Sequence, residues 1–151
     1  MNVYDIMKEK NIVLPEPPAK GGLYAPCKLI GNMAYISGCA CFIGEPITGK
    51  CGTDFTTEEA KKLARICGLN ILAVLQREIG DLNRVKNVAK VVAFVASDPE
   101  FSQQPQVANG ASELFAEIFG MERGVAARSA VGVTVLPWNM PVEIEAIFEV
   151  E

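Results

Sequence analysis

The sequence contains no histidine, and this absence limits the chemistry that its other side chains can perform. Nucleophile systems of the Ser-His-Asp and Cys-His types, the usual neutral-pH proton shuttle and zinc sites that use imidazole are all excluded. The lysines are scattered, so no single Schiff-base residue stands out. Any catalysis must therefore use arginine, lysine, acidic side chains, tyrosine, cysteine, backbone amides and water.

Arg128 is a candidate anion-binding residue because it lies within a run of small and apolar residues. If this run is a strand, alternation places Arg128 on one face with Ala130, Gly132 and Thr134, whose small side chains leave space beside it. A guanidinium in such a hollow suits bidentate capture of a carboxylate. Two other interpretations remain open: Arg128 could pair with an acid on a neighbouring strand, or it could lie at a subunit contact.

Glu143 and Glu145 alternate along a second predicted strand and therefore share one face of it. The opposite face is apolar and consists of Val142, Ile144, Ala146 and Phe148. Alternating acids are also typical of a solvated strand face, and that interpretation stays open. Together, Arg128 and one nearby glutamate would provide an anion clamp and a base that orients water.

Five cysteines are present, and their spacing does not indicate a metal site or a disulfide framework. A metal site would start from Cys39, Cys41 and Cys51, but no CxxC pair or histidine accompanies them. We interpret the cysteines as reduced thiols that serve as small hydrophobic residues. Residues 44–51 resemble a phosphate-binding loop, but Cys51 stands where that motif needs a hydroxyl for magnesium. No metal or cofactor is therefore expected.

The chain of 151 residues is acidic, with 14 Lys and Arg against 18 Asp and Glu and a net charge of −4. This balance disfavours a nucleic-acid partner, because polyphosphates are recognised by a basic surface. The first residues lack the apolar core of a secretory signal, and no stretch approaches the roughly 18 apolar residues that span a bilayer. We expect a cytoplasmic protein without a membrane partner, with residues 1–151 as one domain and residues 1–20 as an N-terminal extension.

Hydrophobic periodicity predicts the elements that would position these residues. Strands are expected at 23–30, 33–38, 88–96, 125–136 and 142–150, and helices at 2–10, 57–80 and 104–119. Residues 14–18 are expected to be extended, and residues 38–54 to form a loop or an irregular hairpin. Thr56 and Glu59 match a capping box, and Gly80 and Gly120 are placed to end the two long helices. This order predicts an α+β fold with two helices on one face of a mixed or antiparallel sheet.

The C-terminal segments resemble the RidA/YjgF family of reactive intermediate deaminases. The resemblance rests on RSAV at 128–131, LP at 136–137 and VEIEAI at 142–147. It is supported by GLY at 22–24, GNM at 31–33, ISG at 36–38, Asn70, GDL at 80–82 and Asn109. The similarity runs from about residue 14 to the end of the sequence. The N-terminal extension and the longer 39–55 loop resemble a longer-chain branch of the family.

This resemblance implies a chorismate-mutase-like fold, a homotrimer with clefts between subunits, and hydrolysis of small 2-imino acids to 2-oxo acids and ammonia. Arg128 would bind the substrate carboxylate and Glu143 would orient the attacking water. Tyr24, Ser37, Gly38 and Asn109 would be substrate-binding residues. Many members carry a cysteine two residues after the arginine, where this sequence has Ala130. Two alternatives stay open: a non-catalytic trimeric binder of a small carboxylate, and an endoribonuclease or translation inhibitor, which the negative charge disfavours.

Overall fold

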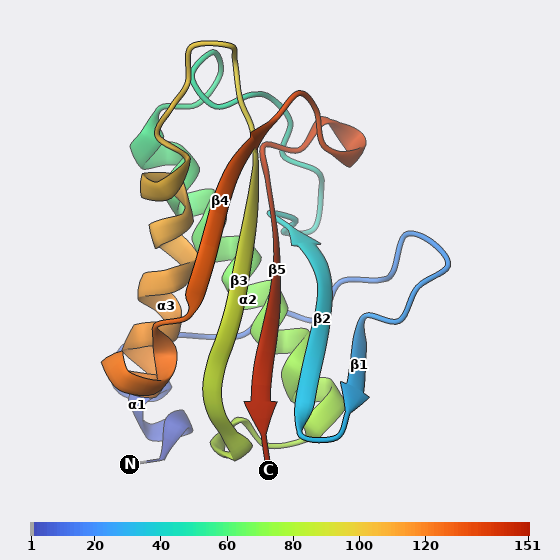
Figure 1. The fold of residues 1–151 in the computed structure, drawn as a ribbon, viewed down its shortest axis with the longest axis vertical. Coiled ribbons are helices and arrows are strands. Elements are labelled where there is room, and N and C mark those ends of the chain that lie inside the picture. Colours follow the sequence, from blue (N-terminus) through green and yellow to red (C-terminus); the bar gives the residue numbers. More distant parts are fainter. Residues whose placement is uncertain (1) are drawn as a thin grey trace.

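The computed structural model describes residues 2–151, which form a five-stranded sheet covered by helices on one face (Figure 1). Its helices are α1 (Val3–Glu9), α2 (Thr57–Ile79) and α3 (Gln104–Gly124), with short 3-10 turns at Leu82–Arg84 and Pro137–Asn139. Its strands are β1 (Cys27–Ile30), β2 (Met33–Ala40), β3 (Val85–Ala96), β4 (Ala127–Val133) and β5 (Val142–Val150).

The sheet is mixed, with strand order β1-β2-β5-β3-β4. Three strand pairs are antiparallel, whereas β3 and β4 are parallel and are joined by α3. A helix is the usual connection between parallel neighbours, because it carries the chain back along the sheet. The α+β fold expected from the order of elements is therefore confirmed.

Local sequence signals explain the ends of the two long helices. The Thr56 side chain accepts from the Glu59 amide and the Glu59 carboxylate accepts from the Thr56 amide, so the predicted capping box forms. Gly80 follows α2 with φ 82°, a left-handed conformation that favours glycine. Gly120 interrupts α3 with φ 84° and ψ 163°, and one further turn continues to Gly124.

Several predicted strand boundaries were wrong. β1 begins at Cys27 rather than at residue 23, because Pro26 has no amide hydrogen to donate to a ladder. β3 begins at Val85, three residues before the predicted start at 88. β4 covers only 127–133 of the predicted 125–136, because its single neighbour β3 ends at Ala96, opposite Val133. β2 extends two residues beyond the predicted end.

The two faces of the sheet are unlike. α2 and α3 pack on one face, where the even-numbered residues of β5 from Val142 to Val150 are buried. Phe115 of α3 meets Phe148 of β5 edge-to-face, with ring centroids 5.7 Å apart. The helices approach so closely that a Cβ on Gly110 would lie 1.9 Å from the Lys61 carbonyl oxygen. The other face carries Glu143, Glu145 and Ile147 of β5 and no helix of residues 2–151 covers it (Figure 1).

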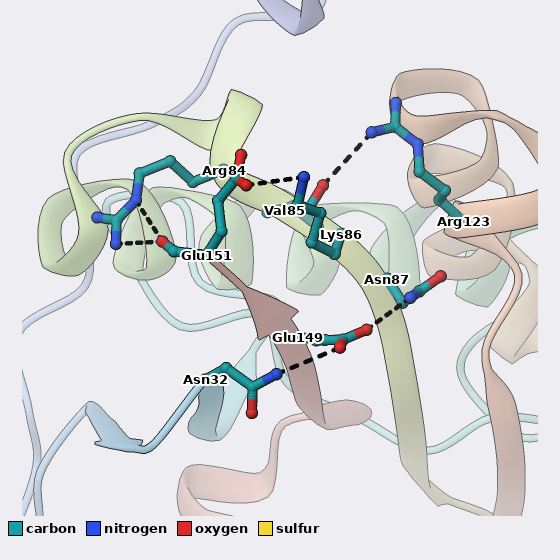
Figure 2. Close-up of polar contacts among 8 residues, drawn as sticks. All are labelled: Asn32, Arg84, Val85, Lys86, Asn87, Arg123, Glu149 and Glu151. Carbon is teal, nitrogen blue, oxygen red and sulfur yellow. Dashed lines mark hydrogen bonds and ion pairs between the residues drawn. The ribbon is translucent and has the colours of Figure 1, made fainter.

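A polar network connects the C-terminal end of β5 to the neighbouring segments of the chain (Figure 2). Glu149 accepts from Asn32 at 3.2 Å and from Asn87 at 2.6 Å, so its carboxylate joins the β1–β2 turn to β3. The Arg84 guanidinium donates to the Glu151 carbonyl oxygen. Within residues 2–151, no helix has both the length and the apolarity needed to cross a membrane.

Candidate functional site

Two adjoining cavities, of about 330 and 350 Å³, lie beside the start of β5. Both are lined by Tyr24, Gly38 and Glu143, and the 350 Å³ cavity is also lined by Ser37. Four of the residues expected to function therefore come together in this chain. We call this group, Tyr24, Ser37, Gly38 and Glu143, the acid half of the candidate site.

A β-bulge in β2 presents Ser37 and Gly38 to this hollow. Ile36 pairs with Ala146 and Cys39 pairs with Ile144, so two residues of β2 face one residue of β5. The additional residue keeps both Ile36 and Cys39 buried although they are three positions apart. Bulges commonly redirect side chains next to functional sites.

Glu143 lies against Gly38, and the Glu143 carboxyl group can occupy this position only because residue 38 is a glycine. A Cβ on residue 38 would lie 2.9 Å from Glu143 Cδ. Half-burial, with a smaller contribution from the Glu145 charge, raises the pKa of Glu143 above its usual range. Among residues 2–151, no hydrogen bond or ion pair neutralises this carboxyl group.

Tyr24 and Ser37 are fixed by the loop that precedes β1. The Tyr24 hydroxyl accepts from the Gly21 amide at 3.0 Å, and the Ser37 hydroxyl donates to the Ala25 carbonyl oxygen at 2.6 Å. The first contact closes the turn at residues 21–24, and the second joins this loop to β2. Hydrogen bonds to backbone groups therefore fix the Tyr24 and Ser37 hydroxyl groups at the hollow.

Arg128 and Asn109 lie together at a different place. Arg128 Nη1 donates to Asn109 Oδ1 at 2.8 Å and to Ser112 Oγ at 3.0 Å, and Nη2 donates to the Pro105 carbonyl oxygen at 3.2 Å. The Arg128 side chain therefore points toward α3, on the same side of β4 as Ala130 and Gly132, as alternation predicts. We call Arg128, Asn109 and Ser112 the arginine half of the candidate site.

The two halves do not meet within one chain. Arg128 lies on the helix-covered side of β4, whereas Glu143 lies on the open side of β5, and β3 separates these strands. No ion pair within residues 2–151 joins Arg128 to an acid, so the interpretation of Arg128 as the partner of an acid on a neighbouring strand was wrong for this chain. Its three acceptors are all uncharged.

The residues at the 330 Å³ cavity that were not identified from the sequence as site residues include Phe42, Trp138 and Cys39. Trp138 is 68% exposed and has φ 54°, an uncommon conformation for a bulky residue. The only signal for it was a lone tryptophan in a proline-flanked loop. Phe42 lies in the irregular 39–55 loop, where periodicity gives no information.

The five cysteines are buried and unpaired, as their interpretation as small hydrophobic residues predicts. Burial, with a contribution from Glu143, raises the pKa of Cys39 to about 12, so this thiol stays protonated beside the cavity. Over residues 2–151, histidine, cysteine and acidic side chains form no group of three or more that could hold a metal ion.

The fold and the sequence both have known relatives. Residues 7–148 match the family described as "YjgF/chorismate_mutase-like, putative endoribonuclease". Protein TCP17 of Trypanosoma cruzi is 39% identical over 145 residues, which cover 95% of this chain and 91% of TCP17. The crystal structure of a protein with unknown function from Agrobacterium tumefaciens has a TM-score of 0.89 and 38% identity, covering 99% of this chain and 92% of that one.

The structural relatives include RidA from the Antarctic bacterium Psychrobacter. RidA has a TM-score of 0.61 and 28% identity, and the match covers 89% of this chain and 94% of RidA. The resemblance on residues 128–131 and 142–147 therefore extends to the whole fold. The chain belongs to the YjgF/chorismate mutase-like family, which includes the RidA/YjgF proteins that its C-terminal motifs resemble.

Proposed function

We propose that this protein hydrolyses reactive 2-imino acids to 2-oxo acids and ammonia. The observation that carries the proposal is the half-buried Glu143 carboxyl group, which faces a hollow without a neutralising partner among residues 2–151. Family membership supports a small-molecule deaminase or binder. A 2-imino acid suits a protein without histidine, because its imine carbon is already electrophilic and needs no nucleophilic side chain.

In this mechanism Glu143 orients a water molecule and accepts one of its protons as the water oxygen bonds to the imine carbon. The raised pKa makes Glu143 a stronger base than an exposed carboxylate, and it keeps the proton that Glu143 accepts available for return to the substrate. Glu143 then returns this proton to the nitrogen and carries the proton of the new hydroxyl group to the nitrogen as well, so that the carbon–nitrogen bond breaks and ammonia and the 2-oxo acid leave. Water is consumed and no electrons are exchanged with a cofactor.

Arg128 would bind the substrate carboxylate, with Asn109 holding its guanidinium. Because the acid and arginine halves are separate within a chain, the complete site requires the arginine half of a second copy. We therefore propose a homotrimer with one site at each subunit interface. This assembly is supported by the open sheet face, where Tyr35 is 42% and Val131 43% exposed.

The first experiment follows the loss of 2-iminopropanoate, generated in situ by an amino-acid oxidase and trapped competitively by semicarbazide. Wild type is compared with Arg128→Ala and with Arg77→Ala, which removes an exposed arginine of α2. Faster loss with wild type and Arg77→Ala, but not with Arg128→Ala, supports the proposal. Circular dichroism checks that each variant is folded.

Two results would contradict imine hydrolysis. If no protein accelerates the reaction while a 2-oxo acid binds wild type but not Arg128→Ala, the protein is a carboxylate binder. If wild type instead cleaves RNA at physiological salt, it is an endoribonuclease, which the net charge of −4 disfavours. Size-exclusion chromatography tests the assembly separately: a trimer elutes at about three times 16.3 kDa, and a monomer would leave the site incomplete.

A further inference from the structure

The 330 Å³ cavity beside Glu143 has mostly apolar walls. Its apolar lining includes Ala40 and Phe42, at and after the end of β2, and Leu136 and Met140, which precede β5. Trp138 and the chain around Ala19 close the rim. Apart from Glu143, the one charged residue in its lining is the exposed Lys20.

These walls are fixed by the surrounding structure. Asn70 is 1% exposed, and its amide nitrogen donates to the Ala40 carbonyl oxygen at 2.9 Å and to that of Phe42 at 3.0 Å. Leu136 and Met140 are buried. The part of the lining at Ala40 and Phe42 is thus anchored to α2, and the part at Leu136 and Met140 belongs to the packed structure.

The rim is also held in place. Trp138 and Asn139 both adopt left-handed backbone conformations, with φ 54° and 56°. The Asn139 carbonyl oxygen accepts from the Gly49 amide at 2.9 Å. The Trp138 ring packs over Gly21, where a Cβ would lie 2.8 Å from the ring. Strained backbone of this kind persists only where surrounding contacts hold it.

We infer that this cavity receives the substrate's side chain, so the preferred 2-imino acids carry a large apolar group, branched aliphatic or aromatic. The inference rests on the proposed function, because it places the reacting carbon beside Glu143, where the two cavities adjoin. The 350 Å³ cavity, which Ser37 also lines, then faces the carboxylate, and the 330 Å³ cavity faces the side chain. A methyl group would leave most of the 330 Å³ unfilled.

Filling the cavity should appear directly in kcat/KM. Each methylene group of the substrate that is buried in the cavity should raise kcat/KM about fourfold, and aromatic side chains bury a still larger apolar area. We expect the imines formed from leucine and phenylalanine to be hydrolysed with kcat/KM on the order of 100-fold above that of the imine formed from alanine.

The test measures these three imines with wild type, Ala40→Leu, Trp138→Ala and Met121→Ala. Ala40→Leu fills the cavity and should abolish the preference while hydrolysis of the alanine imine continues. Trp138→Ala opens the rim at an exposed position and should reduce the preference about tenfold without affecting folding. Met121→Ala changes an exposed residue of the last turn of α3 and should behave as wild type.

Calorimetry with 4-methyl-2-oxopentanoate and pyruvate separates this inference from the proposed function. Equal rates on all imines with equal binding of both oxo acids would overturn the inference and leave imine hydrolysis intact. Selective binding of the larger oxo acid, lost in Ala40→Leu, would support the apolar subsite even if no imine were hydrolysed. If neither oxo acid bound and no imine were hydrolysed, both ideas would be wrong.

Discussion

The arginine half and the acid half of the candidate site are organised in opposite ways. Arg128 is held by Asn109, Ser112 and the Pro105 carbonyl oxygen, whereas the Glu143 carboxyl group has no hydrogen-bond or ion-pair partner among residues 2–151. The Arg128 guanidinium is fixed in direction. The Glu143 carboxyl group instead has its pKa raised by burial and by a neighbouring charge. This difference suits a cation that only binds and an acid that must exchange protons.

The hydrogen-bond acceptors of Arg128 are uncharged, and this is important for binding an anion. Neutral oxygen acceptors orient a guanidinium without cancelling its positive charge, so the charge remains available to an anion. An acid in the same place would compete with the carboxylate of a ligand. The predictions below test whether this division between orientation and proton transfer holds.

The largest effect is expected for Glu143→Gln, which removes the proton acceptor and keeps the side-chain shape. We expect kcat for imine hydrolysis to fall by about 10² to 10⁴. Because the pKa of Glu143 is raised on folding, its ionised form lowers stability once the pH exceeds the unfolded pKa. The thermal midpoint of the variant should therefore exceed that of wild type at pH 7 and match it at low pH, where both forms are neutral.

Glu122→Gln, at an exposed position of α3, is the matched control and should change neither rate nor stability. An unchanged kcat in Glu143→Gln would mean that the acid half does not transfer a proton.

The next effect is expected at Asn109. Asn109→Asp places a negative charge at the oxygen 2.8 Å from Arg128 Nη1 and should raise KM about 100-fold by neutralising the guanidinium. Asn109→Ala removes one acceptor but keeps the positive charge, so its KM should rise only several-fold. Steady-state kinetics on both variants separates two effects on KM: the loss of an acceptor that orients Arg128, and the neutralisation of the Arg128 charge. Equal effects would show that the neutrality of the acceptor is unimportant.

A smaller effect is expected for Gly38→Ala. The added methyl group would meet Glu143 Cδ at 2.9 Å, and the flexible carboxyl group must move away. We expect kcat to fall about tenfold while the unfolding free energy changes by less than about 1 kcal/mol. Gly22→Ala is the control, because its methyl group meets Tyr24 ring carbons at an ordinary 3.6 Å. Full activity in Gly38→Ala would mean that the exact position of the acid is not required.

The smallest effect is expected for Glu145→Gln. Removing this nearby negative charge makes ionised Glu143 less unfavourable, so the pKa of Glu143 should fall toward its usual value. The acid limb of the kcat profile should then move to lower pH by a fraction of a unit, with the maximum rate retained. Burial makes the larger contribution to the raised pKa and should keep most of the shift. A move to higher pH would contradict this assignment.

Short-range signals in the sequence were sufficient to predict most of the helices and strands of the fold. The capping box at Thr56 and Glu59 and the glycine at 80 depend on neighbouring residues alone, and both predictions are confirmed. The alternation of β5 is confirmed for the same reason. Gly120 breaks the helical conformation but does not end α3, because one further turn continues to Gly124. The ends of β4 depend on its partner β3, and the prediction of β4 as residues 125–136 was wrong. The start of β1 was also wrong, although Pro26 is a local signal that could have indicated it.

The candidate site depends more strongly on contacts between distant segments. Alternation assigned the faces of Arg128 and Glu143 within their strands, but not that β3 lies between those strands. The bulge at Ser37 and Gly38 breaks the period of two on which strand prediction relies. The contact between Arg128 and Asn109 joins a strand to a helix, and no local pattern indicates it.

The position of β5 has a consequence for how the protein forms during synthesis. β5 occupies the centre of the sheet, between β2 and β3, although it is the fifth strand in chain order. Until residues 142–150 have left the ribosome, β1 and β2 have no strand that joins them to β3 and β4. The nascent chain therefore holds two unjoined sheet fragments with open edges, which are the features that chaperones protect. Closure of the sheet is then a single late event that creates the bulge, the cavity and the position of Glu143 together.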